Sequence, residues 1–271
     1  MISIVIPVFN QLFYTKECLS HIEKHTHVPF ELIIIDNGST DGTSEFLRNL
    51  SVHLISNREN KGVYVAWNQG IQVSKSDQIV IMNNDILVTP HWASSLLEFS
   101  QKYPRHVIGP AMREGALNYP LIEYSERLTR ACFRGLRMNE LCNFSLVVMQ
   151  RSFFKEVGLF DEQFFVTRGD DDMLIRLREK GIRPVVTGSA FVHHYSEKTQ
   201  EAKSSNFDIQ EIRRQDDFLF RLKWKDLPEK GFFGRRFKKV YDHFIPFYEK
   251  VKYGYSLKTP KEKKERLINN C

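Results

Sequence analysis

The sequence predicts an α/β protein with a mostly parallel central sheet that is flanked by helices. In the first hundred residues, apolar runs alternate four times with segments whose apolar residues recur at helical spacing. The runs are apolar throughout, which is typical of parallel strands buried on both faces. A length of 271 residues fits one large domain, or one domain with a C-terminal appendage.

The first half of the chain contains four predicted strand–helix units. The strands are Ile2–Ile6, Leu32–Ile35, Val52–Ser56 and Ile79–Met82. The first predicted helix is Asn10–Lys24 and the second is a short helix that contains Phe46 and Leu50. The third begins after Asn60-Lys61-Gly62, and the fourth is His91–Tyr103. Ligands of such sheets bind at the carboxyl ends of the strands, so we expect the functional residues to follow Ile6, Ile35, Ser56 and Met82.

The second half is predicted in less detail. Residues 104–142 show little periodicity, so no element is assigned there. The predicted strands are Leu146–Met149, Pro184–Thr187 and Ala190–Val192, and the predicted helices are Ser152–Val157 and Gly169–Lys180. We therefore divide the chain into a domain of residues 1–227, with halves 1–103 and 104–227, and an extension of residues 228–271.

Several classes of protein are disfavoured by what the sequence lacks. No apolar run reaches the ~18 residues of a membrane span, and the start does not read as a signal peptide. The four cysteines form no C-x-x-C pair, so we expect neither a disulfide framework nor a zinc site. We therefore expect the protein in the reducing cytoplasm. The first strand is followed by no G-x-G-x-x-G, and no phosphate loop or G-x-S-x-G elbow occurs, which disfavours dehydrogenases, P-loop kinases and α/β-hydrolases.

The basic charge is concentrated at the C-terminal end. Residues 230–271 hold 12 Lys and Arg against 4 Asp and Glu, whereas residues 1–229 hold 27 against 29. Nine aromatic residues are interleaved with these basic residues. One interpretation is a helical extension that packs its aromatics on the body; the other is peripheral contact with an anionic membrane on its inner face. We expect no nucleic-acid partner.

Polar residues follow two of the predicted strands. Asp36 ends the second strand, where its carboxylate can accept from a base N–H or a ribose hydroxyl, or can form an Asx turn. Asn83-Asn84-Asp85 follows the fourth strand. It is either a turn or an oxygen site for Mg²⁺ or Mn²⁺ with positions left open for a diphosphate.

Two further clusters lie in the second half. Asp170, Asp171 and Asp172 begin a helix, where they favour the positive end of the helix dipole, and Asp172 can pair with Arg176. Alternatively, one of the three is a general base, and the spacing does not say which. His193-His194 follows an apolar strand and is either structural or a metal ligand that complements Asp85.

The order of these segments resembles family 2 glycosyltransferases of the GT-A fold (nucleotide-diphospho-sugar transferases), in their rhamnosyltransferase-like branch. The resemblance covers about residues 1–200. The segments that carry it are Pro7-x-Phe9-Asn10, Ile35–Thr43, Asn60-x-Gly62, Met82–Asp85, Val157–Glu162, Gly169–Asp172 with Arg176-Leu177, Gly181 and Val192-His193.

The resemblance implies a role for each matched residue. The nucleotide would be contacted by Pro7, Phe9, Asn10, Asp36, Asn60, Asn68, Asn83 and Asn84. Asp85, in the place of the family's Asp-x-Asp, would bind the divalent metal, and His193, or His194 one register position later, would assist it. Asp170 would be the catalytic base. The chain departs from the family at Asn83, where the motif has Asp, at Gly169, where it often has Glu, and at Trp67, where it often has Arg.

The sequence therefore predicts an inverting hexosyl- or deoxyhexosyltransferase. It would use Mn²⁺ or Mg²⁺ and a nucleotide-diphosphate sugar, and its acceptor would be a glycan, a lipid-linked glycan or a protein. Such an enzyme would act in the synthesis of a cell-surface glycan or polysaccharide. The alternatives are a non-catalytic carbohydrate- or partner-binding protein on a transferase body, and a nucleotidyltransferase.

Overall fold

The computed structural model describes residues 1–132, 137–139, 144–196 and 208–225. The extension of residues 228–271 lies outside the described residues, so its predicted membrane contact stays a prediction. Within the described residues, no helix is both long enough and apolar enough to cross a bilayer.

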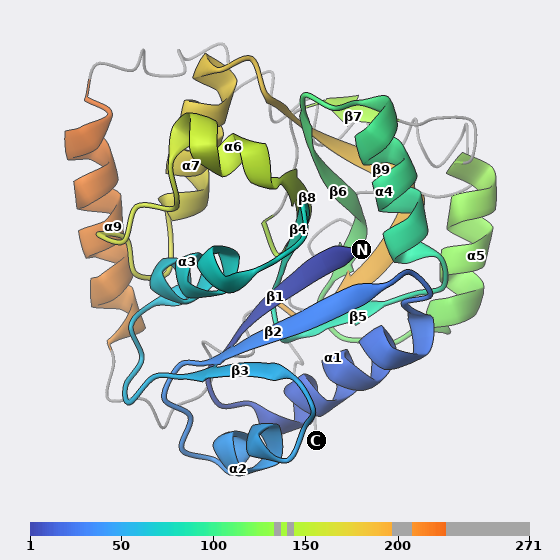
Figure 1. Cartoon of the computed structure of the whole chain (residues 1–271), viewed down its shortest axis with the longest axis horizontal. Coiled ribbons are helices and arrows are strands. Elements are labelled where there is room, and N and C mark those ends of the chain that lie inside the picture. Colours follow the sequence, from blue (N-terminus) through green and yellow to red (C-terminus); the bar gives the residue numbers. More distant parts are fainter. Residues whose placement is uncertain (133–136, 140–143, 197–207, 226–271) are drawn as a thin grey trace, which may run out of the picture.

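One nine-stranded sheet forms the centre of the molecule (Figure 1). The strands are β1 (Ile2–Val8), β2 (Phe30–Asp36), β3 (His53–Ser56), β4 (Gln78–Met82), β5 (Ile86–Val88), β6 (His106–Glu114), β7 (Arg137–Asn139), β8 (Leu146–Gln150) and β9 (Arg183–His194). Their order is β3-β2-β1-β4-β8-β6-β9-β5, and β7 pairs with β9. The first four strands pair in parallel, as do β6 and β9, whereas β8 and β5 run antiparallel to their neighbours. The predicted mostly parallel sheet is thus confirmed, and its antiparallel strands make it a mixed sheet.

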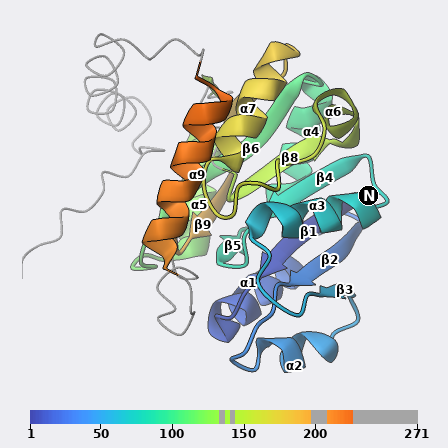
Figure 2. The ribbon, with the colours of Figure 1, turned by 90° about the vertical axis from the view of Figure 1, so that its left-hand side faces the viewer.

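Helices cover both faces of this sheet (Figure 2). They are α1 (Leu12–His25), α2 (Thr43–Arg48), α3 (Val63–Val73), α4 (Trp92–Lys102), α5 (Leu121–Cys132), α6 (Arg151–Val157), α7 (Gly169–Glu179) and α9 (Ile209–Lys223). Alternate residues of β1 enter different cores. Ile4 and Ile6 pack with α1 and α4, whereas Val5 packs with α3, α6 and α7. Burial on both faces explains why the strand sequences are apolar without alternation.

The region with little sequence periodicity is where the prediction was incomplete. Residues 106–114 form the nine-residue strand β6, and residues 121–132 form α5. The two short strands predicted at 184–187 and 190–192 are one strand, β9, with a register shift: Thr187 pairs with Pro110, but Phe191 pairs with Ala111. The polar and glycine residues between them gave the appearance of a break.

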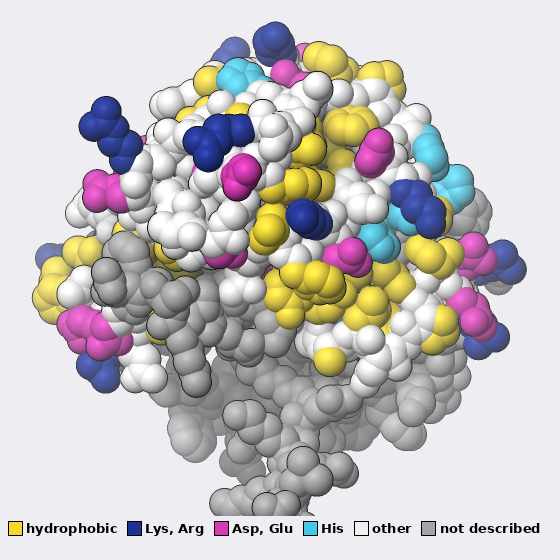
Figure 3. Space-filling model, turned by 90° about the horizontal axis from the view of Figure 1, so that it is seen from below, with side chains coloured by type: hydrophobic (Ala, Val, Ile, Leu, Met, Phe, Trp, Pro, Cys, Tyr) yellow, Lys and Arg dark blue, Asp and Glu magenta, His cyan; other side chains and the backbone are white. Residues whose placement is uncertain are grey.

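The described surface carries charges of both signs. On the face seen in Figure 3, hydrophobic side chains gather near the middle, and the Lys, Arg, Asp and Glu side chains lie singly around them. This pattern agrees with the near-neutral charge of residues 1–229.

The packing of α3 on the sheet yields a test of the fold. A Cβ added at Gly70 would overlap Val5 Cγ1 and approach Ile35 Cδ1 to 2.9 Å, and both side chains are fully buried. Gly70→Ala should therefore lower the free energy of unfolding by about 1–3 kcal/mol, although alanine usually favours a helix over glycine. Urea denaturation measures the change. Gln72→Ala, at an exposed position of the same helix, is the control, and an unchanged or raised stability of Gly70→Ala would contradict the packing.

Candidate active site

A cleft of about 420 Å³ opens at the carboxyl ends of β1 and β4. Its other walls come from the segment that opens α3, the first turn of α7, the end of β9 and the start of α9. Of the residues predicted from the sequence, seven line it: Pro7, Phe9, Asn60, Asn83, Asn84, Asp85 and Asp170. The structure thus brings the carboxylates of Asp85 and Asp170, which are 85 positions apart in the sequence, to one cavity.

Asp85 lies between β4 and β5, and its carboxylate is buried. Because Ile86 pairs with His194 across β5 and β9, the side chain of His194 comes next to Asp85. His194 Nε2 donates to Asp85 Oδ1 at 3.1 Å, and its Nδ1 donates to Glu114 Oε1 at 3.3 Å. Burial disfavours the charged imidazole, but these hydrogen bonds outweigh that cost and raise the pKa of His194 to about 9. His194 is therefore a cation at neutral pH and compensates the charge of Asp85.

The neighbouring His193 points away from the cleft. Successive residues of a strand face opposite sides of the sheet, so the two histidines cannot both face Asp85. The fully buried His193 ring lies under α5, with Nδ1 2.9 Å from the hydroxyl of Tyr119. Burial and the charges of His194 and Arg113 lower the pKa of His193 to about 4. The histidine next to Asp85 is thus His194, one residue later than the sequence comparison implied.

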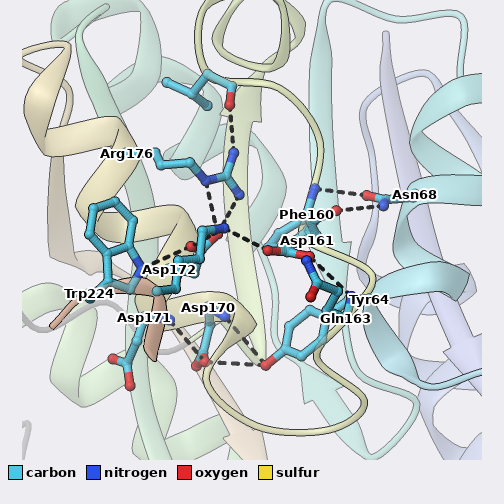
Figure 4. A network of polar contacts seen from close by, with 12 residues as sticks. Tyr64, Asn68, Phe160, Asp161, Gln163, Asp170, Asp171, Asp172, Arg176 and Trp224 are labelled. Atoms are coloured by element: carbon cyan, nitrogen blue, oxygen red, sulfur yellow. Dashed lines mark hydrogen bonds and ion pairs between the residues drawn. The ribbon is translucent and has the colours of Figure 1, made fainter. Parts of the chain in front are cut away.

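The three consecutive aspartates of α7 have different surroundings (Figure 4). Asp172 is fully buried and accepts from Arg176 Nε at 2.9 Å, Lys223 Nζ at 2.7 Å and Trp224 Nε1 at 3.0 Å. Asp171 pairs at 2.8 Å with Arg168 near the surface. Only Asp170 lines the cleft. The structure therefore distinguishes three residues whose spacing in the sequence did not.

The carboxylate of Asp170 lies against Tyr64. The Tyr64 hydroxyl is 3.3 Å from Asp170 Oδ1, and the backbone N–H of Asp171 donates to the same oxygen at 3.0 Å. Burial, followed by the negative charge of Asp171, raises the pKa of Asp170 above its ordinary value. A carboxylate with a raised pKa is a stronger base at neutral pH.

Tyr64 also explains the glycine that precedes Asp170. A Cβ at Gly169 would lie 2.6–2.7 Å from three carbons of the Tyr64 ring. Any side chain here, including the glutamate that the resemblance implied, would displace the ring from Asp170. The departure from the family pattern at Gly169 is thus coupled to the tyrosine at position 64.

Asn60 supports the wall of the cleft through its amide oxygen. Asn60 Oδ1 accepts from Asn37 Nδ2 at 2.8 Å and from the backbone N–H of Gly62 at 2.9 Å. Asn37 Oδ1 in turn accepts from Asn57 Nδ2 at 2.9 Å and from the backbone N–H of Lys61 at 3.2 Å. These bonds fix the loop between β3 and α3, where Gly62 has a φ of 87°.

Three predicted nucleotide contacts, Asn10, Asn68 and Asp36, do not line the main cleft. Asn10 is buried and accepts from the backbone N–H of Thr40 at 2.7 Å. Asn68 is buried as well, with its amide bonded to both backbone groups of Phe160 and to Glu162. Both amides thus hold loops in place.

Asp36 lines a separate hollow of about 220 Å³. Its carboxylate accepts from the backbone N–H of Ser39 at 3.0 Å and from the hydroxyl of Ser44. The same hollow is lined by Arg48 and Arg58. Of the carboxylates at positions 36, 85 and 170, therefore, only the last two share the main cleft.

Several residues that line the cleft were not predicted from the sequence, because they belong to no recognised motif. Tyr64, Phe165, Val166, Glu114, Ile209 and Ile212 all line the cleft. Glu114 arrives there because β6 and β9 are parallel and in register at Glu114 and His194. No sequence signal marked that strand, so only the pairing identifies the residue.

The donor set at Asp85 limits how a cation can bind. Among the described residues, no group of three or more His, Cys, Asp and Glu side chains is arranged to hold a metal ion. One carboxylate at a strand end fits a divalent cation whose remaining ligands are phosphate oxygens and water, as is usual for Mg²⁺. The site thus suits a cation that arrives with a diphosphate, and not one held by the protein alone.

The loop before α7 is held in place by α9. The buried carboxylate of Asp216 accepts from the backbone N–H groups of Phe165, Val166 and Thr167 at 2.8–3.0 Å, and from the Thr167 hydroxyl at 3.1 Å. Arg168, which follows, has a φ of 70° and bonds Asp171 and Asp217. Because Asp170 comes two residues later, α9 determines where the cleft carboxylate lies.

Comparison with known proteins identifies a matching family and several relatives. The profile of the family described as glycosyl transferase family 2 matches residues 3–157. Glycosyltransferase GlyG of Streptococcus pneumoniae is 34% identical over 113 residues, which are 40% of this chain and 38% of GlyG. The chain thus matches about two fifths or less of the length of the first curated relatives.

Two solved structures share the fold. The mannosyltransferase PcManGT of Pyrobaculum calidifontis, in complex with GDP-Man and Mn²⁺, superposes with a TM-score of 0.60 at 16% identity, covering 84% of this chain and 65% of that chain. GalNAc-T7 with UDP, GalNAc and Mn²⁺ gives a TM-score of 0.56 at 18% identity, covering 72% of this chain and 43% of that chain. These likenesses confirm the predicted GT-A fold.

The Asp216 cluster can be tested by hydrogen exchange. Asp216→Asn removes the charge that three N–H groups share, so the amides of residues 165–167 should exchange at least tenfold faster. The free energy of unfolding should fall by about 1–3 kcal/mol. Hydrogen–deuterium exchange and urea denaturation measure the two effects. Glu211→Gln, at an exposed position of the same helix, is the control; equal exchange rates in both variants would refute the role of Asp216.

Proposed function

The chain belongs to glycosyl transferase family 2, and from this we propose that it transfers a sugar, with inversion, from a nucleotide-diphosphate sugar to an acceptor hydroxyl. The observation that supports this most strongly is that Asp85 and Asp170 line one cleft at the carboxyl ends of the strands. A transferase of this kind needs a cation site for the leaving diphosphate and a base for the acceptor, and the two carboxylates fit these two roles.

The polar end of the cleft would take the donor. Asp85 would hold a divalent cation together with the diphosphate, while Pro7, Phe9 and Asn60 line the space next to it. When bound, such a cation supplies positive charge beside the leaving group. His194 Nε2 lies 3.1 Å from Asp85 Oδ1, and the contact of its Nδ1 with Glu114 fixes the ring next to the carboxylate.

Asp170 would act on the acceptor. Its carboxylate accepts the proton of the attacking hydroxyl, the oxygen bonds to the anomeric carbon, and the nucleoside diphosphate leaves from the opposite face. The raised pKa of Asp170 favours proton transfer, and the Tyr64 hydroxyl holds the carboxylate in place. General base catalysis of this kind typically contributes ~10²–10⁴-fold to the rate.

Replacing the base should separate catalysis from binding. Asp170→Asn keeps the size of the side chain but cannot take a proton, so transfer should fall at least a hundredfold. Binding of UDP or GDP with Mn²⁺, measured by calorimetry, should stay within about threefold. Asp77→Asn, which changes an exposed aspartate before β4, far from the cleft lining, is the control. A panel of nucleotide sugars, assayed for release of the nucleotide, serves as the rate measurement, and full activity in Asp170→Asn would refute the assignment.

Replacing the cation ligand should act on binding instead. Asp85→Ala should weaken the Mn²⁺-dependent binding of UDP or GDP at least tenfold. Asp85 carries the single carboxylate of the Asn83-Asn84-Asp85 segment, so its removal leaves no charged cation ligand there. Calorimetry with and without Mn²⁺ gives the two affinities. Asp77→Ala, exposed at the opposite end of β4, is the control. If Asp85→Ala binds the nucleotide as tightly as the control in the presence of Mn²⁺, Asp85 does not hold the cation.

A further inference from the structure

The walls of the cleft differ in chemistry. The strand ends supply polar groups, among them Asn83, Asp85 and His194, whereas α9 and the loop before α7 supply hydrocarbon. The side chains on this second part of the wall are Phe165, Val166, Ile209 and Ile212, and each is only half-buried in the described structure. We call these four residues the apolar wall.

The apolar wall has a defined orientation. Ile209, Ile212 and Asp216 are spaced three and four residues apart, so they share one face of α9. Asp216 on that face binds the backbone of Phe165 and Val166, so Ile209 and Ile212 face the same loop. Phe218 and Leu222 are exposed elsewhere on this helix. The apolar wall is therefore a fixed surface and not a chance grouping of side chains.

The apolar wall also adjoins Asp170. Val166 precedes Asp170 by four residues, and the carbonyl of Phe165 accepts from the backbone N–H of Val63 at 2.8 Å, next to Tyr64. Tyr64 in turn contacts Asp170. A molecule that presents a hydroxyl to Asp170 thus shares the cleft with these four side chains. A fully hydroxylated sugar would leave its own polar groups without partners there, which is costly.

We infer that the acceptor is amphipathic: a sugar hydroxyl carried next to a hydrocarbon group, with the hydrocarbon against Ile209, Ile212 and Val166. This inference rests on the proposed function, because it takes Asp170 as the base. Burial of the hydrocarbon gives affinity in proportion to its area, and the polar strand ends stay free for the donor. A glycolipid whose accepting sugar adjoins its lipid has this chemistry, whereas a free polysaccharide does not.

The test compares two sets of soluble probes. The full chain, with UDP and Mn²⁺ or GDP and Mn²⁺, is titrated with n-octyl and with methyl glycosides of glucose, galactose and mannose below the micelle concentration. Tryptophan fluorescence reports binding, because Trp67 lines the cleft. At least one octyl glycoside should bind at least tenfold more tightly than its methyl counterpart. No preference for any octyl glycoside, or displacement of the octyl glycoside by the nucleotide, would overturn the inference.

Variants assign the binding to the apolar wall. Ile212→Asn should reduce the octyl preference to less than about threefold, and Ile209→Ser, a milder change near the start of α9, should reduce it as well. Leu222→Asn places the same polar side chain on an exposed position of the same helix and should keep the preference. Thermal melting verifies that each variant is folded. If Leu222→Asn loses the preference equally, or both isoleucine variants keep it, the apolar wall is not the site.

A second comparison separates this inference from the proposed function. Asp170→Asn should keep the octyl preference while losing transfer. If no nucleotide sugar is turned over by the unaltered chain but the octyl preference is present and sensitive to Ile212→Asn, the proposed function fails and the apolar site stands. If turnover is present and the preference is not, the inference about the acceptor fails alone.

Discussion

The geometry of the site depends on two buried carboxylates, Asp172 and Asp216, that join α7, α9 and the loop between α6 and α7. A charge in the interior must be compensated, because its desolvation costs several kcal/mol. Asp172 is compensated by Arg176 and Lys223, and Asp216 by three consecutive backbone N–H groups. Both sets of partners cross between elements. The position of Asp170 therefore follows from contacts that Asp170 itself does not make.

Desolvation also distinguishes the ionisable groups of the cleft. Asp170 has a hydroxyl and one N–H as hydrogen-bond donors and a negative neighbour, so its pKa rises. His194 is buried too, but two carboxylates accept from it, so its pKa rises for the opposite reason. One part of the cleft thus holds a carboxylate suited to accept a proton, and another holds a cation next to Asp85. This separation agrees with a reaction in which a proton is taken from the acceptor while charge grows on the leaving group.

The departures from the family pattern have a structural context. Gly169 leaves room for the Tyr64 ring, which contacts Asp170. Trp67, where the resemblance implied arginine, packs with Tyr64 and Phe160 in the core beneath the cleft. At both positions the chain makes or permits contacts with aromatic rings. Aliphatic residues of α9 line the same cleft as Asp170.

The sequence alone determined the strand–helix order of the first half and the place of Asp85 after its fourth strand, because apolar strands and the polar residues at their ends are local features, and its resemblance to family 2 glycosyltransferases indicated the GT-A fold. It did not determine β6 and α5, the choice among Asp170, Asp171 and Asp172, or the histidine next to Asp85. Those depend on strand register and helix contacts. A shift of one residue along β9 exchanges the environments of His193 and His194, and no local pattern specifies that register. The tertiary structure decided which residues share a cavity, since side chains distant in sequence meet only through packing.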